Sequence, residues 1–318
     1  MKNLLRALLL SILAQSGAMA FAADDEVAVF TKNKVDPFFE GARAGADASA
    51  KRLGLKTIHF APTKPNNLQE QVAQMEDAIV RKPRGIVFVP VDLKGFKGAI
   101  DKARAANIPV VNYIDEGEGN FNGVVVFDNR KLGGMVARHL AQSIGGKGGV
   151  VIIEGVKGSS TSDARTAGAL EALKAFPDIR VLAVQPANYQ RLQALQVMEN
   201  LMQTHPQIDG VIAAADVMAL AAGEAMDAAG RKRAAIVGMD GTIEGAKAVL
   251  DGRMLASGAF SGFTMGCLAV EMIDRIARKQ SVPARVGLEA ELIDKRTAAD
   301  YVVPFDKRQC KRLADLGY

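Results

Sequence analysis

The chain has no tryptophan, and among its 318 residues it has only four tyrosines, three histidines and two cysteines. Its net charge of +5 is small and is spread without any block of like charge. Recognition of nucleic acids needs clustered Lys and Arg together with aromatic side chains on which bases stack. We therefore expect no nucleic-acid partner.

The histidines and cysteines also bear on catalysis and metal binding. His59, His139 and His205 are scattered, and the chain lacks HExxH, C-x-x-C, G-x-S-x-G and the phosphate-binding G-x-x-x-x-G-K-[ST] loop. Acidic residues are plentiful, but no spacing selects a pair of them. We therefore expect no catalytic residues, no cofactor and no metal site.

The two cysteines are too few for a disulfide scaffold. Cys267 lies in an apolar helical stretch, which favours a buried free thiol, and the sequence leaves the state of Cys310 open.

Long hydrophobic runs are also missing, although a short one occurs at the start of the chain. Residues 1–22 have a basic start with Lys2 and Arg6, an apolar stretch too short to span a membrane, and small residues at Ala20 and Ala22. This pattern predicts a secretory signal peptide, cleaved on export to the periplasm.

Short β-branched runs are what the sequence does have. They recur as 27–30, 57–60, 85–89, 108–113, 123–127, 149–153, 180–184, 210–214 and 234–238. They are continuously apolar, as expected for parallel strands covered on both faces. Helical stripes lie between them, such as Leu68, Val72, Met75 and Ile79. The alternation predicts an α/β fold of βαβ units, and the length favours two lobes.

Ligands of open parallel sheets bind at the carboxyl ends of the strands, so the first junction, "TKNKVDPFF", is of interest. Asp36 and Pro37 predict a helix start. Consecutive helical residues face different ways, so we expect Phe39 in the core and Phe38 toward a cleft. Lys32 reads as an exposed lysine, with a reach into the cleft as the alternative, and Asp92 reads as the cap of a following helix.

Several stretches, in register and in order, resemble the ribose-binding-protein-like periplasmic solute-binding proteins of ATP-binding cassette importers. They include "DPFFEGARAGADASAKRLG", "DNRKLGGMVARHLA", "GSSTSDARTAGALEAL", "QPANYQRLQALQVMENLMQTHPQIDG" and "VGMDGTIEGAKAVLDGRMLAS". The resemblance implies the type I fold, which has two Rossmann-like lobes with parallel sheets joined by a three-segment hinge. Its implied divisions are 23–127 plus 261–285 for the first lobe, 128–260 plus 286–297 for the second, and a C-terminal extension, 298–318.

The resemblance also implies a set of ligand-binding residues. The matched positions are Asp36, Phe38, Phe39, Arg165, Tyr189 and Asp240. The chain departs from the family pattern at "NYIDEGEG", where we expect Asn112, Asp115 or both to bind the ligand. It also has Ala215 in place of an asparagine and Phe260 in place of a glutamine. Losing two polar contacts argues against ribose itself.

The function implied is that of a periplasmic, non-catalytic, monomeric receptor. It would close over a small polyhydroxylated ligand, such as a pentose, a deoxy sugar or a sugar alcohol, and deliver it to the membrane permease of an importer. Presentation of the ligand to a chemoreceptor or sensor kinase is the alternative. DNA-binding regulators that share the fold begin with a helix-turn-helix, whereas this chain begins with a predicted signal peptide.

Overall fold

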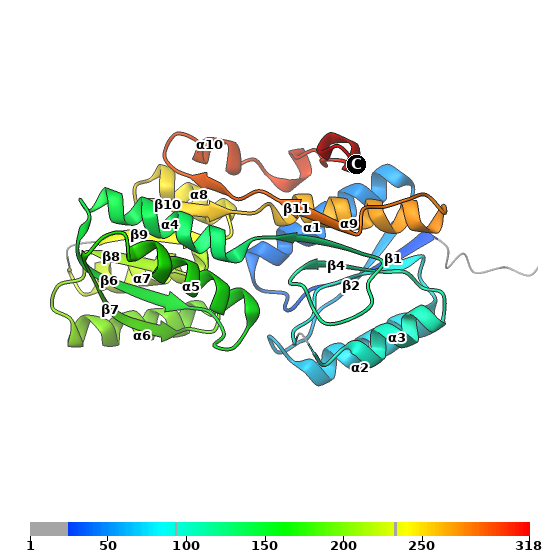
Figure 1. Ribbon diagram of the computed structural model, residues 1–318, viewed down its shortest axis with the longest axis horizontal. Helices are drawn as coiled ribbons and strands as arrows, with labels where there is room; N and C mark the ends of the chain where they lie inside the picture. The colour runs from blue at the N-terminus through cyan, green and yellow to red at the C-terminus, as the bar shows by residue number, and fades with distance from the viewer. Residues whose placement is uncertain (1–24, 93, 232–233) are drawn as a thin grey trace, which may run out of the picture.

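The chain folds into two lobes, each built on a six-stranded sheet (Figure 1). The computed structural model describes residues 25–92, 94–231 and 234–318. The predicted signal peptide, residues 1–22, lies outside them. Every strand pairing is parallel except that of β12 with β10. The α/β class expected from the alternating runs is therefore confirmed.

The first lobe contains the N-terminal strands and two elements from near the end of the chain. Its strand order is β11 (Arg285–Leu288), β5 (Gly123–Phe127), β4 (Val110–Ile114), β3 (Gly85–Phe88), β1 (Glu26–Phe30) and β2 (Lys56–Phe60). Its helices are α1 (Pro37–Leu53), α2 (Leu68–Arg81), α3 (Lys97–Ala105) and α9 (Gly262–Ala277).

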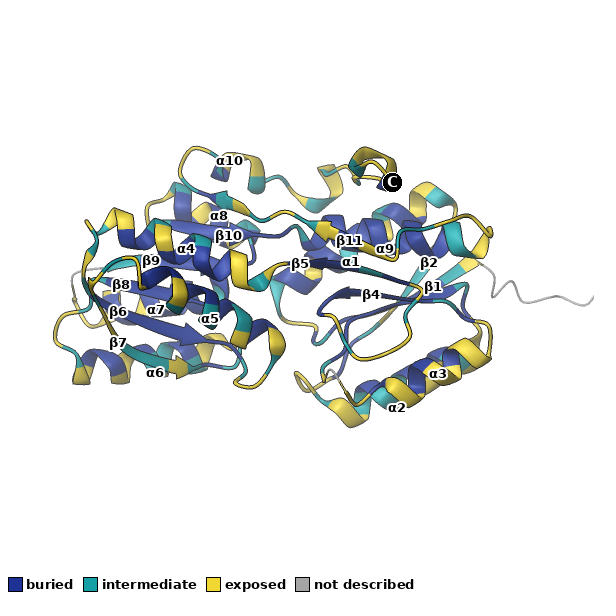
Figure 2. Cartoon of the chain, in the orientation of Figure 1, coloured by how far each residue is buried: buried dark blue, intermediate teal, exposed yellow. Residues whose placement is uncertain are grey.

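Helices cover both faces of this sheet. In β1, Val27 and Val29 belong to the cluster formed with α1 and α9, whereas Ala28 and Phe30 belong to the cluster formed with α2 and α3. Successive side chains of a strand point to opposite faces, so a strand covered on both must be apolar throughout. Figure 2 shows the result, with the inner strands buried and the outer surfaces of α2 and α3 exposed.

The second lobe follows the same plan. Its strand order is β12 (Glu291–Ile293), β10 (Ala256–Ala259), β9 (Ala235–Met239), β8 (Gly210–Ala213), β6 (Lys147–Glu154) and β7 (Asp178–Pro186). Its helices are α4 (Asn129–Ser143), α5 (Ser160–Leu173), α6 (Arg191–Thr204), α7 (Asp216–Ala228), α8 (Ile243–Leu250) and the short α10 (Ala298–Tyr301).

The chain passes between the two sheets three times, after β5, after β10 and between β11 and β12. Because β11 pairs with β5, residues 285–288 belong to the first sheet. The third crossing therefore lies further along the chain than the predicted division between 285 and 286.

The C-terminal segment runs back from the second lobe onto the first. It contains two short 3₁₀ turns, η2 (Phe305–Lys307) and η3 (Leu313–Leu316). Cys310 forms a disulfide with Cys267 of α9, and Leu313 is fully buried. The prediction of a free thiol at Cys267 was wrong, because its partner is distant in sequence and only the folded tail brings it near.

No helix within the described residues is both long enough and apolar enough to cross a membrane.

Candidate ligand-binding site

A cavity of about 460 Å³ lies between the lobes. The loops that follow β1, β2, β3 and β4 form one wall, and the loops that follow β6, β7 and β9, with helices α5 and α7, form the other. These loops leave the carboxyl ends of parallel strands, where open sheets bind ligands. A second hollow, about 660 Å³, lies on the second lobe alone, between the starting ends of its strands and Arg231. It contains residues from only one lobe, so we take the interlobe cavity as the candidate site.

Most of the residues predicted for the site line this cavity. They are Asp36, Phe38, Phe39, Asp115, Arg165, Tyr189 and Asp240.

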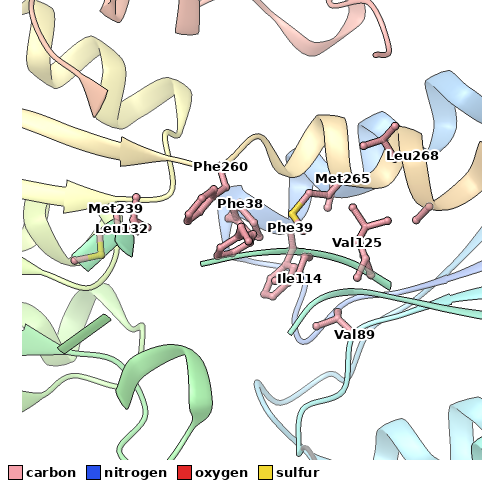
Figure 3. Packing of buried hydrophobic residues seen from close by; sticks show 14 of the residues in the cluster. Phe38, Phe39, Val89, Ile114, Val125, Leu132, Met239, Phe260, Met265 and Leu268 are labelled. Carbon is pink, nitrogen blue, oxygen red and sulfur yellow. The ribbon is translucent and has the colours of Figure 1, made fainter. Parts of the chain in front are cut away.

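Asn112 and Phe260, also predicted, are not among the lining residues. Asn112 is fully buried within β4, and its Nδ2 donates to the carbonyl of Phe88 at 3.1 Å. Phe260 stacks on Phe127, with the ring centroids 3.7 Å apart. Both residues are therefore buried away from the cavity lining, and Figure 3 shows Phe260 close to Phe38 at the junction of the lobes.

The first junction forms the helix start that the sequence predicts. Asp36 is the N-cap of α1, its side chain accepts from the backbone N–H of Phe38 at 2.9 Å, and Pro37 is the first helical residue. Burial raises the pKa of the Asp36 carboxyl. As expected, Phe39 is buried and Phe38 lines the cavity; in addition, Phe38 is also buried and Phe39 also lines the cavity. Their rings meet edge to face, with centroids 5.6 Å apart.

Arg165 and Asp240 form a buried ion pair on the second lobe. Nη1 of Arg165 lies 2.8 Å from Oδ1 of Asp240 and also donates to the carbonyl of Ala214, while Nε donates to Asn129. Burial raises the pKa of Asp240 well above its ordinary value although Arg165 opposes the shift. The guanidinium is thus fixed in place beside the cavity.

Two glycines allow helix α5, which carries Arg165, to pack closely against α4. A Cβ on Gly133 of α4 would overlap the carbonyl of Arg165, and one on Gly168 of α5 would overlap the carbonyl of Arg130. The helices α4 and α5 can therefore approach until their backbones touch.

A second polar cluster joins the two lobes. Lys32, in the loop after β1, pairs with Asp115, which follows β4, and Thr161 of α5 donates to the same carboxylate. Burial alone would raise the pKa of Asp115, but the Lys32 charge and the hydrogen bonds from Lys32 and Thr161 hold it below its ordinary value. The reading of Lys32 as an exposed lysine was wrong, since its side chain is 15% exposed and lines the cavity.

Tyr189 lines the cavity beside a glycine. It follows β7, and both Asn188 and Tyr189 have positive φ, 53° and 58°. The Tyr189 ring lies so close to Gly155 that a Cβ there would overlap it. Burial raises the pKa of its hydroxyl.

Several lining residues were not predicted. Asn33, Pro65, Asn66, Thr161, Asn188 and Gln190 all lie in loops or at the first turns of helices. Their position in the segments that follow predicted strands was the available signal. Val35 and Leu192, one from each lobe, line the cavity while remaining 80% and 67% exposed.

Asp92, expected to cap the next helix, instead accepts from the N–H groups of Lys94 and Gly95 in the turn ahead of α3.

No group of three or more His, Cys, Asp or Glu side chains suited to a metal ion occurs within residues 25–92, 94–231 and 234–318.

Comparison with known proteins gives consistent results. The family model described as the periplasmic binding protein domain matches residues 27–281. The ribose import binding protein RbsB of Escherichia coli K12 is 32% identical over 296 residues, covering 92% of this chain and 98% of that protein. The D-allose-binding periplasmic protein of the same organism is 32% identical over 286 residues, covering 86% and 92%.

A solved structure is similar throughout. The periplasmic solute-binding protein of an ABC transporter from Actinobacillus succinogenes, with bound D-allose, is 29% identical and superposes with a TM-score of 0.83, covering 87% of this chain and 99% of that one. The resemblance seen in the sequence is therefore confirmed, and the chain belongs to the periplasmic binding protein family.

Proposed function

We propose that the protein is a periplasmic, non-catalytic receptor that captures a small sugar or sugar alcohol between its lobes and delivers it to the permease of an ABC importer. The observation that carries this proposal is the cavity itself. Its two walls come from different lobes, and each supplies buried charged groups next to an aromatic side chain.

The chemistry of the lining suits a neutral polyhydroxylated ligand. Asp240 and Asp115 accept hydrogen bonds from hydroxyl groups, and Arg165 donates them. Each of these charges already has a partner of opposite sign, so the ligand need not bring a charge. The faces of Phe38 and Tyr189 cover the C–H surface of a ring.

The ligand we propose is a pentose other than ribose, a deoxy or methylated sugar, or a sugar alcohol. Ala215, at the start of α7, is fully buried and brings no polar side chain. Ala215 does not line the cavity, so a ligand hydroxyl that the family's asparagine would bind has no side-chain partner from this position, which disfavours a ligand carrying one there.

Closure of the lobes about the three crossings is the mechanism we propose. Contacts from both walls can be made together only when the lobes are near, so the ligand shifts the population toward the closed form. The Thr161 to Asp115 hydrogen bond already joins the lobes, and it would favour this form.

A thermal-shift screen tests the proposal. The mature protein is unfolded and refolded to remove carried ligand, then heated with pentoses, hexoses, deoxy sugars and sugar alcohols. At about 100 times its dissociation constant, a ligand stabilises the native state by about 2.7 kcal/mol. The matched control is Asp240→Asn, which should lose the response, and small-angle scattering should show the wild type contracting with ligand. No shift with any sugar would overturn the proposal.

A further inference from the structure

Asp216 lies behind the loop that presents Asp240 and does not line the cavity. It is the first residue of α7 and is fully buried. The loop in question joins β9 to α8 and consists of residues 240–242. Asp216 and this loop are distant in sequence but in direct contact.

The Asp216 carboxylate accepts hydrogen bonds with both of its oxygens. Oδ2 accepts from the backbone N–H of Thr242 at 2.8 Å and from its hydroxyl at 2.9 Å. Oδ1 accepts from the hydroxyl of Ser257 on β10 at 2.5 Å, and that hydroxyl oxygen in turn accepts from the N–H of Gly241 at 3.2 Å. Asp216 therefore holds the loop directly at Thr242 and through Ser257 at Gly241.

The loop needs such support because its first residue is strained. Asp240 has φ of 117°, in a region that residues with a Cβ rarely adopt. Such a conformation costs on the order of 1–3 kcal/mol and persists only where the surroundings fix it. The N–H of Asp240 donates to Gly258, and Asp216 fixes the two residues that follow.

Two glycines leave the space that the Asp216 carboxylate fills. A Cβ on Gly238 would overlap its Oδ1, and a Cβ on Gly245 would overlap its Oδ2. Both glycines flank the loop, on β9 and α8. The sequence on each side of the loop therefore accommodates this carboxylate.

Burial of the Asp216 carboxylate lowers the stability of the fold. Burial raises the pKa of Asp216 to about 6, so at neutral pH the ionised form is present at a cost in stability. A less costly way to pack this position would be an apolar side chain. This points to a role other than stability.

We propose that Asp216 is a positioning residue for ligand binding, which holds the 240–242 loop so that Asp240 presents its carboxylate to the cavity. This inference rests on the proposed function, since it takes Asp240 as a ligand contact. It assigns to Asp216 a role at the site without contact with the ligand.

The test compares Asp216→Ala with a matched control, Met226→Ala. Met226 is buried near the other end of the same helix, and its side chain forms no hydrogen bond with the 240–242 loop. Binding of D-allose, or of the sugar giving the largest thermal shift, is measured by calorimetry. We expect Asp216→Ala to weaken binding at least tenfold and Met226→Ala to change it less than twofold, even if both lower the melting temperature. Equal losses of affinity would overturn the inference.

Hydrogen exchange supplies a readout that needs no ligand. Exchange at Gly241 and Thr242 should become faster in Asp216→Ala relative to the rest of the lobe, and Asp216→Asn should recover part of the protection because its amide oxygen still accepts from Thr242. If Asp216→Ala fails to fold, Ser257→Ala removes two bonds of the network, the one it donates to Asp216 and the one it accepts from Gly241, and should speed exchange at Gly241. Unchanged exchange at the loop in Asp216→Ala would overturn the inference, even if no sugar binds to the wild type. If exchange at the loop is faster in Asp216→Ala but no sugar binds to the wild type, only the proposed function is overturned.

Discussion

Arg165 and Asp240 form their 2.8 Å ion pair with side chains only 4% and 7% exposed. The same guanidinium donates to Asn129, the first residue of α4 after the chain crosses from the first lobe. Arg165 thus connects the candidate site with one of the crossings.

From the sequence alone, Arg165→Ala is expected to weaken binding and leave the fold intact. The structure changes this expectation, because removing the guanidinium leaves Asp240 buried and unpaired. Loss of one partner of a buried pair typically costs about 3–5 kcal/mol. Urea unfolding should show a loss of this size in Arg165→Ala. Arg130→Ala, which removes a surface pair with Glu171, should lose less than about 1 kcal/mol.

Gly155→Ala should damage the site more than the fold. The added Cβ overlaps the Tyr189 ring, which must therefore move from its place in the cavity wall. We expect sugar affinity to fall at least tenfold in calorimetry, with a change in melting temperature of a few degrees. Gly98→Ala, at an open position on α3, is the control and should leave affinity unchanged. Wild-type affinity in Gly155→Ala would mean that the ring does not contact the ligand.

The stability of the protein should depend on pH through Asp216. Its pKa in the folded state, about 6, lies above the ordinary value of 3.8, so the folded state binds a proton more tightly than the unfolded state. The stability gained is complete below about pH 4 and is lost as the pH rises through 6, a change of about 3 kcal/mol.

Comparison with Asp216→Asn isolates this contribution. Asp240 and Arg165 are the charged groups that face Asp216, and Asp240 titrates in the same direction. The free energy of unfolding of the wild type, relative to that of the variant, should decrease from pH 4 to pH 7 in urea titrations. A difference independent of pH would contradict the shifted pKa.

The disulfide should stabilise the fold. Cys267 and Cys310 are 43 residues apart in sequence, and closing a loop of this length stabilises by about 4 kcal/mol in the chain-entropy treatment. Dithiothreitol should therefore lower the urea midpoint of the wild type. The double variant Cys267→Ser/Cys310→Ser should have the lower midpoint from the start and show no response to the reductant.

Periodicity predicted the elements that carry strong apolar runs, and it missed those that do not. The strand β10 consists of Ala-Ser-Gly-Ala, which has little β propensity. It forms because it lies between β9 and β12 and because Gly258 lets Leu132 of α4 approach. Such a strand depends on tertiary contacts that no local window contains.

Most of the site was predicted from the resemblance to a known family, and it was missed where partners are distant in sequence. Asp36 and Asp240 lie in loops that follow predicted strands, and both stand in stretches that match the family. Lys32 reads as an ordinary surface lysine until folding brings Asp115 next to it. Asp216 reads as an acidic residue in the first turn of a helix, and its hydrogen bonds to Thr242 and Ser257 exist only in three dimensions.

The late position of β11 and β12 has a consequence for folding order. The outermost strand next to β5 and the outermost strand next to β10 both lie within residues 285–293. During synthesis, which starts at the N-terminus, the chain can therefore complete neither sheet until nearly all of it has been made. Fragments that end before residue 285 would leave β5 and β10 as edge strands in place of β11 and β12. The exposed edge of β5, Gly-Val-Val-Val-Phe, would be a template for aggregation, so the last tenth of the chain keeps this apolar strand inside its sheet.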